Sequence, residues 1–300
     1  MKKTLVTGAS GFIGKHSLPL LLQAGHEVHA VSLKKKHASG NDISWHQADL
    51  RDYSQTKRLI AKVQPTHLLH LAWYTKPGNF WDDPENVQWV QASLELLQAF
   101  QVHGGKRIVV AGTCAEYDWN EEICSEKETP VKPATLYGNC KQKLQMKADT
   151  FCKKAQLSIC WGRVFFVYGP HEHPARLIPS VIRSLLKKEP AECSHGKQNR
   201  DLLYVEDVAS GFVALMENEI TGIVNIGSGE SVLLRNVVET IGEKIGCPEL
   251  IRLGVIPSRP DDPTMLVADA SKLRQEVGWT PRFNLDKGLD QTIKWWKGLL

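Results

Sequence analysis

A tyrosine and a lysine stand four residues apart near the middle of the chain, downstream of a threonine. Tyr137 and Lys141 fall in a helix predicted over 136–155, so their i, i+4 spacing places them on one face, one turn apart. A phenol has an unperturbed pKa near ~10, and an ammonium group beside it favours the phenolate. Such a tyrosine can exchange a proton with a carbinol or carbonyl oxygen near neutral pH. Thr113 lies just past the strand predicted at 107–111 and can hold the same oxygen, so the three side chains predict acid–base chemistry at a carbon–oxygen bond.

The chain opens on a short apolar strand that turns on glycines into a helix. Gly8, Gly11 and Gly14 recur at three-residue intervals within T-G-A-S-G-F-I-G, residues 7–14. The first allows a tight turn, the second lets backbone N–H groups approach a pyrophosphate, and the third lets the helix pack close to the sheet. The spacing differs from the G-x-G-x-x-G of ordinary dehydrogenases. Its place between a strand and a helix favours a dinucleotide site over an ordinary turn.

The elements that must hold these residues alternate between strands and helices. We expect strands at 4–7, 28–33, 68–71, 107–111 and 158–167, with helices at 15–23, 54–63, 86–103 and 136–155. Further on we expect a helix at 176–188, a strand at 202–205, a helix at 208–217, a strand at 223–226, a helix from 231 to 246, a short strand at 251–253 and two final helices. This alternation predicts an α/β fold, a doubly wound parallel Rossmann-type sheet with a small, discontinuous C-terminal lobe for the substrate. The dinucleotide-binding domain is predicted over 1–169 and 201–227, and the substrate lobe over 170–200 and 228–300.

Composition narrows the class of protein. With 300 residues and 42% hydrophobic composition, the chain can bury a substantial core. A net charge of +4 and scattered lysines argue against a nucleic-acid partner, and no stretch approaches the ~20 apolar residues that span a bilayer. We expect no signal peptide, because the first strand occupies the N-terminus. The seven cysteines show no C-x-x-C pair, which is typical of free thiols in the cytoplasm, and no metal site is expected.

Several further motifs follow in a fixed order along the chain. They are H-L-A (70–72), G-T-C-A-E-Y (112–117), Y-G-N-C-K (137–141), R-V-F-F-V-Y-G-P (163–170), R-D-L-L-Y-V-E-D-V-A (200–209), N-I-G-S-G-E (225–230) and G-W-T-P (278–281). Together with the glycine turn, they resemble the extended short-chain dehydrogenase/reductase family, in particular its nucleotide-sugar epimerases, dehydratases and ketoreductases. The resemblance is closest to the 4-ketoreductases and runs nearly end to end.

The resemblance implies roles for individual residues. Thr113, Tyr137 and Lys141 would be catalytic, with Lys141 also on the nicotinamide ribose, and the helices at 86–103 and 136–155 would form a homodimer. Asp49 and Leu50 would lie beside the adenine, and Ala72 beside the ribose and pyrophosphate. The expected cofactor contacts are Gly8, Ser10, Gly11, Phe12, Ile13, Gly14, Ser32, Lys34, Lys35, Asp49, Leu50, Leu71, Ala72, Trp73, Tyr137, Lys141 and Tyr168.

The end of the second predicted strand bears on the choice of cofactor. NAD-specific enzymes place an acidic residue there to hold the ribose 2′-hydroxyl. This chain has Ser32 and then a run of lysines at 34–36, so nothing repels a 2′-phosphate. We therefore expect a preference for NADP(H), with NAD(H) possible and a solvated basic loop as the alternative reading.

The substrate side is read mainly from the resemblance. Arg200 and Arg259 stand where family members clamp a nucleotide diphosphate, and the aromatic segment at 73–81 either covers the sugar or caps the sheet. Family dehydratases carry an Asp-Glu pair directly after the threonine, whereas this chain has Cys114 and Ala115, with Glu116 either a structural carboxylate or a substrate contact. The expected substrate contacts are Tyr74, Trp81, Cys114, Glu116, Arg176, Arg200 and Arg259.

These observations lead to a ranked set of functions. The leading expectation is NADPH-dependent reduction of a nucleotide-linked 4-keto-(di)deoxyhexose, with the proton supplied by Tyr137. The alternative is a nucleotide-sugar 4-epimerase that holds NAD tightly. A reductase of non-sugar ketones and a non-catalytic dinucleotide-binding protein complete the set, although the latter usually loses the tyrosine or the lysine.

Overall fold

A parallel sheet of seven strands organises the part of the chain that the computed structural model describes, residues 2–34, 42–258 and 262–300. The strand order is β12-β7-β5-β4-β1-β2-β3. The strands are β1 (Lys3–Thr7), β2 (Glu27–Ser32), β3 (Ile43–Gln47), β4 (His67–His70), β5 (Arg107–Thr113), β7 (Ser158–Val164) and β12 (Gly222–Ile226). Their carboxyl ends meet along one edge, which is where ligands bind in such sheets.

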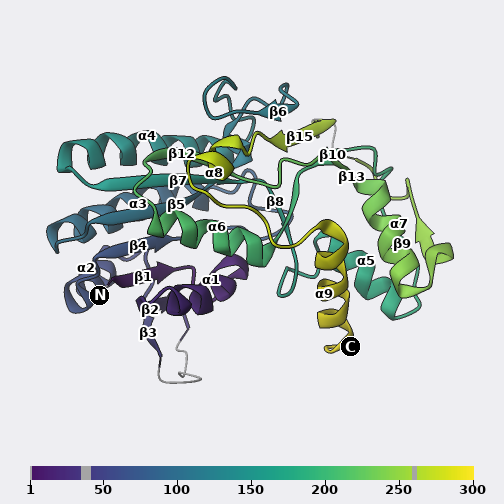
Figure 1. The fold of residues 1–300 in the computed structure, drawn as a ribbon, viewed down its shortest axis with the longest axis horizontal. Coiled ribbons are helices and arrows are strands. Elements are labelled where there is room, and N and C mark those ends of the chain that lie inside the picture. Colours follow the sequence, from purple (N-terminus) through teal and green to yellow (C-terminus); the bar gives the residue numbers. More distant parts are fainter. Residues whose placement is uncertain (1, 35–41, 259–261) are drawn as a thin grey trace.

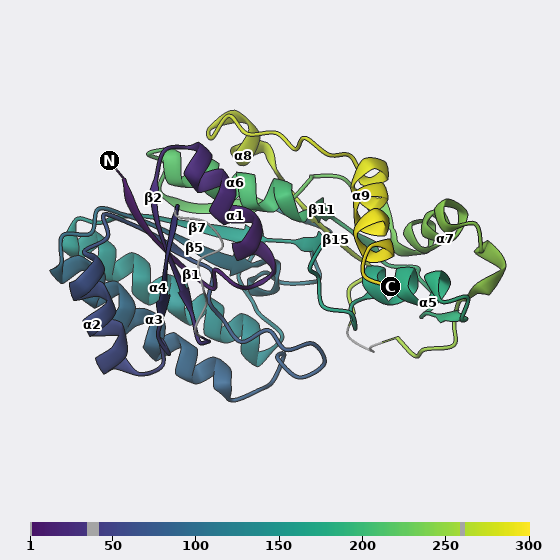
Figure 2. The same cartoon turned by 90° about the horizontal axis from the view of Figure 1, so that it is seen from below.

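Helices cover both faces of this sheet, as Figures 1 and 2 show. One face carries α1 (Phe12–Gln23) and α6 (Val205–Glu217), and the other carries α2 (Tyr53–Val63), α3 (Glu85–Val102) and α4 (Leu136–Ala155). Each layer has its own apolar core, with Phe212 and Leu21 on the first face and Leu96 and Phe100 on the second, all fully buried. The predicted doubly wound α/β fold is thus confirmed.

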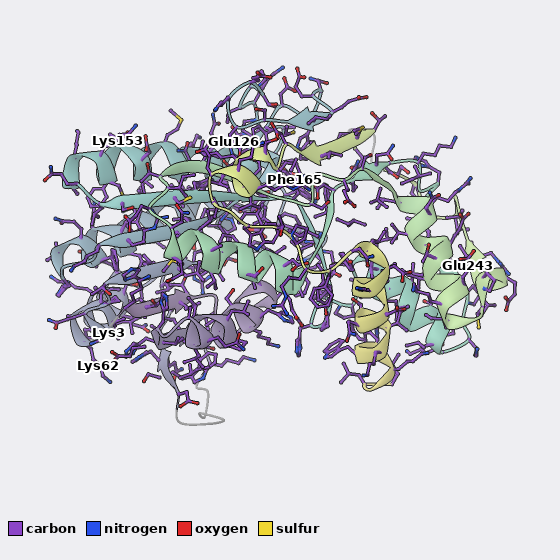
Figure 3. All side chains as sticks on the ribbon, viewed as in Figure 1. Lys3, Lys62, Glu126, Lys153, Phe165 and Glu243 are labelled. Carbon is purple, nitrogen blue, oxygen red and sulfur yellow. The ribbon has the colours of Figure 1, made fainter. Side chains whose placement is uncertain are left out.

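A smaller lobe lies beyond the carboxyl edge of the sheet (Figure 1). It contains α5 (Leu177–Leu186), α7 (Leu234–Ile245), α9 (Leu285–Lys297), the short 3-10 helix η2 (Pro248–Leu250) and the strand pair β9 (Ala191–Glu192) and β14 (Ile251–Arg252). A separate core that includes Ile182, Val237 and Leu289 holds these helices together. In Figure 3, Phe165 lies between sheet and lobe, and Glu243 on α7 marks the outer edge of the lobe.

Short strands link the sheet and the lobe. A four-stranded sheet has the order β13-β10-β15-β6, and β11 pairs with β8 alone. These strands are β6 (Ile123–Cys124), β8 (Phe166–Tyr168), β10 (Asn199–Arg200), β11 (Leu202–Tyr204), β13 (Val232–Leu233) and β15 (Met265–Ala268). Asp201 is fully buried and connects segments that are far apart in the chain. Its carboxylate accepts hydrogen bonds from the backbone N–H groups of Ser228 at 2.6 Å, Gly229 at 2.9 Å and Ala268 at 3.1 Å.

The structure differs from expectation at several places. Strand β3 was missed because Ile43–Gln47 alternates apolar and polar residues, as an edge strand does, and lacks an apolar run. The strand expected at 158–167 is two strands, because the chain breaks at Phe165, and 202–204 pairs outside the main sheet. The helix α8 (Ser271–Gln275) and Trp279 pack with α6 and β12 rather than in the lobe. The division into two domains remains our proposal, with 271–279 lying on the sheet side. None of the helices in the described ranges combines the length and apolarity needed to cross a membrane.

Candidate active site

A cavity of about 930 Å³ opens between the carboxyl edge of the sheet and the lobe. Its wall contains most of the residues singled out in the sequence. They are Gly8, Ser10, Gly11, Phe12, Ile13, Gly14, Ser32, Lys34, Leu50, Leu71, Ala72, Trp73, Trp81, Thr113, Cys114, Tyr137, Lys141, Arg176 and Arg200. One continuous space therefore joins the glycine turn, the tyrosine–lysine pair and the two arginines.

The glycine turn forms a cradle that side chains would fill. Gly8 has φ +64°, and a Cβ built there would lie 2.8 Å from the backbone nitrogen of Ala72, two residues past the neighbouring strand β4. A Cβ on Gly14 would lie 2.2 Å from the carbonyl oxygen of Gly8, so only glycine lets α1 start this close to β1. Helix α1 begins at Phe12 and presents its N-terminus to the cavity. Free N–H groups and a positive helix end fit a pyrophosphate, so the residues present fit a dinucleotide.

The tyrosine is positioned by the first turn of α4. The hydroxyl of Thr135 caps this helix by accepting the backbone N–H of Gly138 at 3.1 Å. Gly138 has no room for a side chain, because a Cβ there would lie 2.2 Å from the carbonyl oxygen of Ala115. The backbone N–H of Tyr137 donates to the carbonyl oxygen of Trp81 at 2.8 Å. Helix α4 is thereby fixed between the turn after β5 and the aromatic segment at 73–81.

Thr113 approaches the tyrosine from the sheet, whereas Lys141 lies one turn further along the same helix, α4. Thr113 is the last residue of β5, not a residue beyond the strand as expected, and its hydroxyl hydrogen-bonds Tyr137. The ammonium of Lys141 donates to the carbonyl oxygen of Ala111 at 2.8 Å and lies 3.9 Å from the centre of the Trp73 ring. The expected trio therefore lines one wall of the cavity.

Burial sets the electrostatics of this wall. It raises the pKa of the Tyr137 phenol well above its ordinary value, although the hydrogen bond with Thr113 and the charge of Arg176 act in the opposite direction. Burial also lowers the pKa of Lys141 to about 7, against the charge of Glu116. We expected Lys141 to lower the pKa of the phenol; instead burial raises this pKa, the groups that act against burial are Thr113 and Arg176, and the phenol keeps its proton at neutral pH.

Glu116 is placed away from the cavity. Residues 114–116 form a 3-10 turn, η1 (Cys114–Glu116), and the carboxylate turns into the interior with no exposed surface. It accepts Trp161 Nε1 at 2.9 Å, the backbone N–H of Thr113 at 2.9 Å and Arg163 Nε at 2.8 Å. Of the two roles we considered, the structure favours the structural one.

Other expected contacts also lie off the wall. Asp49 pairs with Arg51 at 2.9 Å, so both of its carboxylate oxygens face that guanidinium. Tyr168 is buried under α9, where its hydroxyl donates to the carbonyl oxygen of Leu285 at 3.3 Å. Tyr74 bonds Asp83 beside the cavity. These roles rested on family positions that local packing uses differently here. Lys35 and Arg259 lie outside the described residues.

The substrate end of the cavity is aromatic with cations at its margin. Phe80 and Trp81 meet the Tyr137 ring edge-on, at centroid distances of 5.0 and 5.9 Å. Arg176 lies over the Phe80 ring at 5.3 Å, and Arg200 pairs with Asp262 at 2.7 Å. Sequence reasoning missed many lining residues, among them four that are polar or aromatic, and of these four only Trp119 gave any signal, by its position beside the threonine turn. They are Trp119, Glu172, His173 and Asp262.

Known proteins provide a comparison for this geometry. Residues 4–227 match the profile of the NAD dependent epimerase/dehydratase family. A UDP-glucose 4-epimerase of Corynebacterium glutamicum is 27% identical and aligns over 93% of this chain and 91% of its own. The structure of MoeE5 in complex with UDP-glucuronic acid and NAD is 30% identical, with a TM-score of 0.85, and covers 99% of this chain and 100% of that one. A Thermus thermophilus UDP-glucose 4-epimerase in complex with NAD is 26% identical, with a TM-score of 0.88, over 99% and 100% of the two chains.

Proposed function

The chain belongs to the NAD-dependent epimerase/dehydratase family, and from that premise we propose that it moves hydride to or from C4 of a nucleotide-linked hexose. The observation that carries the proposal is the meeting of Tyr137, Thr113 and Lys141 in the cavity that also holds the glycine cradle. The cradle would hold the pyrophosphate of NAD(P), Trp73 would face the ribose, and the bound nicotinamide supplies or accepts hydride.

The side chains of this chain would handle the proton. Thr113 donates a hydrogen bond to the C4 oxygen, and Tyr137 gives that oxygen a proton when it is a ketone; in the reverse direction the phenol must first lose its own proton before it accepts the one from the carbinol. Both side chains are buried, at 8% exposure each, so water has little access to the reacting atoms. Cys114 and Ala115 take the places of the acid–base pair of family dehydratases, which disfavours dehydration.

The first candidate within this chemistry is a 4-epimerase that keeps NAD bound. The epimerases among the relatives support it, as does the NAD in two of the compared structures. Purified protein should then carry NAD that denaturation releases, and it should interconvert UDP-glucose and UDP-galactose with no added cofactor. Protein that carries no cofactor and leaves UDP-, dTDP-, GDP- and CDP-hexoses unchanged would exclude this candidate.

The second candidate is the NADPH-dependent 4-ketoreductase. It is favoured by Ser32 and Lys34 at the end of β2, where no carboxylate opposes a 2′-phosphate, and by the proton that Tyr137 keeps at neutral pH. A panel of nucleotide-linked 4-keto sugars with NADPH or NADH, followed by loss of nicotinamide absorbance, separates it from the first.

Replacing the tyrosine tests what both candidates share. Tyr137→Phe should lower turnover by about 10²–10⁴-fold, because the proton carrier is lost, while binding of NAD(P) stays within about twofold. Full activity in this variant would remove Tyr137 from the reaction.

We also propose a homodimer through the outer faces of α3 and α4. These faces expose Val87, Val102 and Met146 at 56%, 73% and 58%. Light scattering after size exclusion measures the mass directly.

All seven cysteines are unpaired, which supports a reducing location such as the cytoplasm.

A further inference from the structure

Glu172 is a buried carboxylic acid in the cavity wall that the acid–base chemistry above does not use. It belongs to the loop from β8 to α5, and the residue borders the cavity at only 8% exposure. The same loop lies against α1, since the carbonyl oxygen of Pro170 is 3.1 Å from His16 Nε2. Glu172 therefore lies between α1, which starts at the glycine cradle, and α5, which Arg176 precedes as its N-cap residue.

One oxygen of this carboxyl group has no partner. The group accepts a hydrogen bond from the backbone N–H of Gly169, but Oε2 meets no donor or acceptor among the described residues. A buried polar atom left unpaired is costly, at roughly 1–3 kcal/mol, and native proteins keep few of them. Such an atom in the wall of a ligand cavity indicates a partner that arrives with the ligand.

Arg176 identifies the chemistry of that partner. Its guanidinium lies over Phe80, and within the described ranges no carboxylate approaches it closely enough to form an ion pair. The two side chains thus offer a cation without a counter-anion and a carboxyl oxygen without a partner, four residues apart in one wall. A diphosphate satisfies both, because guanidinium pairs with its charge and a neutral carboxyl group can donate to one of its oxygens.

We infer that Glu172 is a further ligand-binding residue, whose neutral carboxyl group donates a hydrogen bond to an oxygen of a diphosphate held beside Arg176. The inference rests on the proposed function only in requiring a diphosphate ligand. Nucleotide sugars and nicotinamide dinucleotides both contain one, and the test below separates these two sources.

Burial supports the neutral form that this contact requires. It raises the pKa of Glu172 to about 8, while Arg176 and the N–H of Gly169 act in the opposite direction. The other titratable groups of the packed elements are Lys15 and His16 on α1 and His171 and His173 on the loop. The charge that shifts the pKa of this carboxyl group is that of Arg176. Near neutral pH the group is a donor, whereas ionisation would place a negative charge beside the diphosphate.

Calorimetric titration with UDP-glucose and, separately, with NAD⁺ tests the inference without turnover. The phosphates of both ligands are diesters and do not titrate over this range. Because only the protonated fraction binds, Kd should rise about tenfold between about pH 7 and about pH 9. Glu172→Gln keeps a donor and cannot ionise, so its Kd should change less than about twofold over the same range. Glu189→Gln, which removes an exposed carboxylate after α5, should behave as the unaltered protein.

The arms of the experiment give distinct outcomes. A pH effect with UDP-glucose assigns Glu172 to the substrate diphosphate, and one with NAD⁺ assigns it to the cofactor. A Kd that does not change with pH in the unaltered protein overturns the inference. An equal change of Kd with pH in the unaltered protein and in Glu172→Gln also overturns it, and would assign the titration to another group such as Lys141. Turnover alongside flat curves leaves the proposed function intact, whereas failure of both ligands to bind overturns both proposals.

Discussion

Replacing Glu116 by glutamine should destabilise the protein and alter its pH response together. The carboxylate accepts N–H groups from Thr113, Trp161 and Arg163, and neither it nor Arg163 is exposed. A glutamine has one acceptor oxygen, so one or two of these donors lose their partner at about 1–3 kcal/mol each, and a buried guanidinium loses its counter-charge. Removing one member of a buried pair costs about 3–5 kcal/mol, which lowers Tm by about 6 °C or more.

The same substitution should also change the pKa of Lys141. The charge of Glu116 raises the pKa of Lys141, which burial sets at about 7, so Glu116→Gln should lower that pKa further. Thermal unfolding and the pH profile of turnover are the two measurements, with Glu121→Gln, an exposed carboxylate in the next loop, as the matched control. A Tm within about 1 °C of the unaltered protein, while the control behaves the same, would refute the account of Glu116 as a structural anion.

Two further predictions concern cofactor binding, and a third concerns the pH dependence of stability. Gly14→Ala should weaken NAD(P) binding by about tenfold or more, since its Cβ would lie 2.2 Å from the Gly8 carbonyl oxygen. The control is Gly298→Ala, whose Cβ would have its nearest neighbour at 3.5 Å and which should leave the Kd of NAD(P) unchanged. Ser32→Asp should raise the Kd of NADP⁺ relative to that of NAD⁺ by about tenfold or more, because a carboxylate at the end of β2 repels a 2′-phosphate. Ser44→Asp on β3 is the control, and an unchanged ratio of the two Kd values in Ser32→Asp would contradict the placement of the ribose beside Ser32. Between about pH 7 and the ordinary lysine value, the unfolded chain binds a proton at Lys141 that the folded protein does not, so stability should rise with pH; Lys141→Met should flatten that rise in urea midpoints, and an unchanged slope would exclude the buried ammonium as its cause.

The sequence predicted the fold best where a local rule decides the structure. Helix α4 has the predicted bounds, 136–155, and the glycine turn stands between a strand and a helix as expected. Both depend on residues close together in the chain, such as the Thr135 cap and Gly8. The edge strand β3 carries no comparable local signal, since its alternating residues fit a surface strand or a loop equally well.

The site was harder to predict where side-chain direction decides the role. Glu116 is one residue from Ala115 on the cavity wall, yet the 3-10 turn points its carboxylate at Arg163, forty-seven residues away. Tyr168 belongs to a recognisable motif, but α9, from the end of the chain, covers it. Such long-range contacts leave no pattern in a single sequence, and Glu172 Oε2 has no partner among the residues that the structure describes.

The hydrogen bonds that Asp201 accepts from distant segments have a consequence for how the protein folds during synthesis. Strand β12, the last strand of the main sheet along the chain, emerges during synthesis after α5 and the strands β6, β8, β10 and β11. Strands β13 and β15 and the backbone groups that bind Asp201, up to Ala268, come later still. A nascent chain that ends before that point holds a carboxylate with unmade contacts and part of a ligand cavity. We therefore expect the two halves to acquire their final orientation in one concerted event after Ala268 has emerged, rather than one after the other.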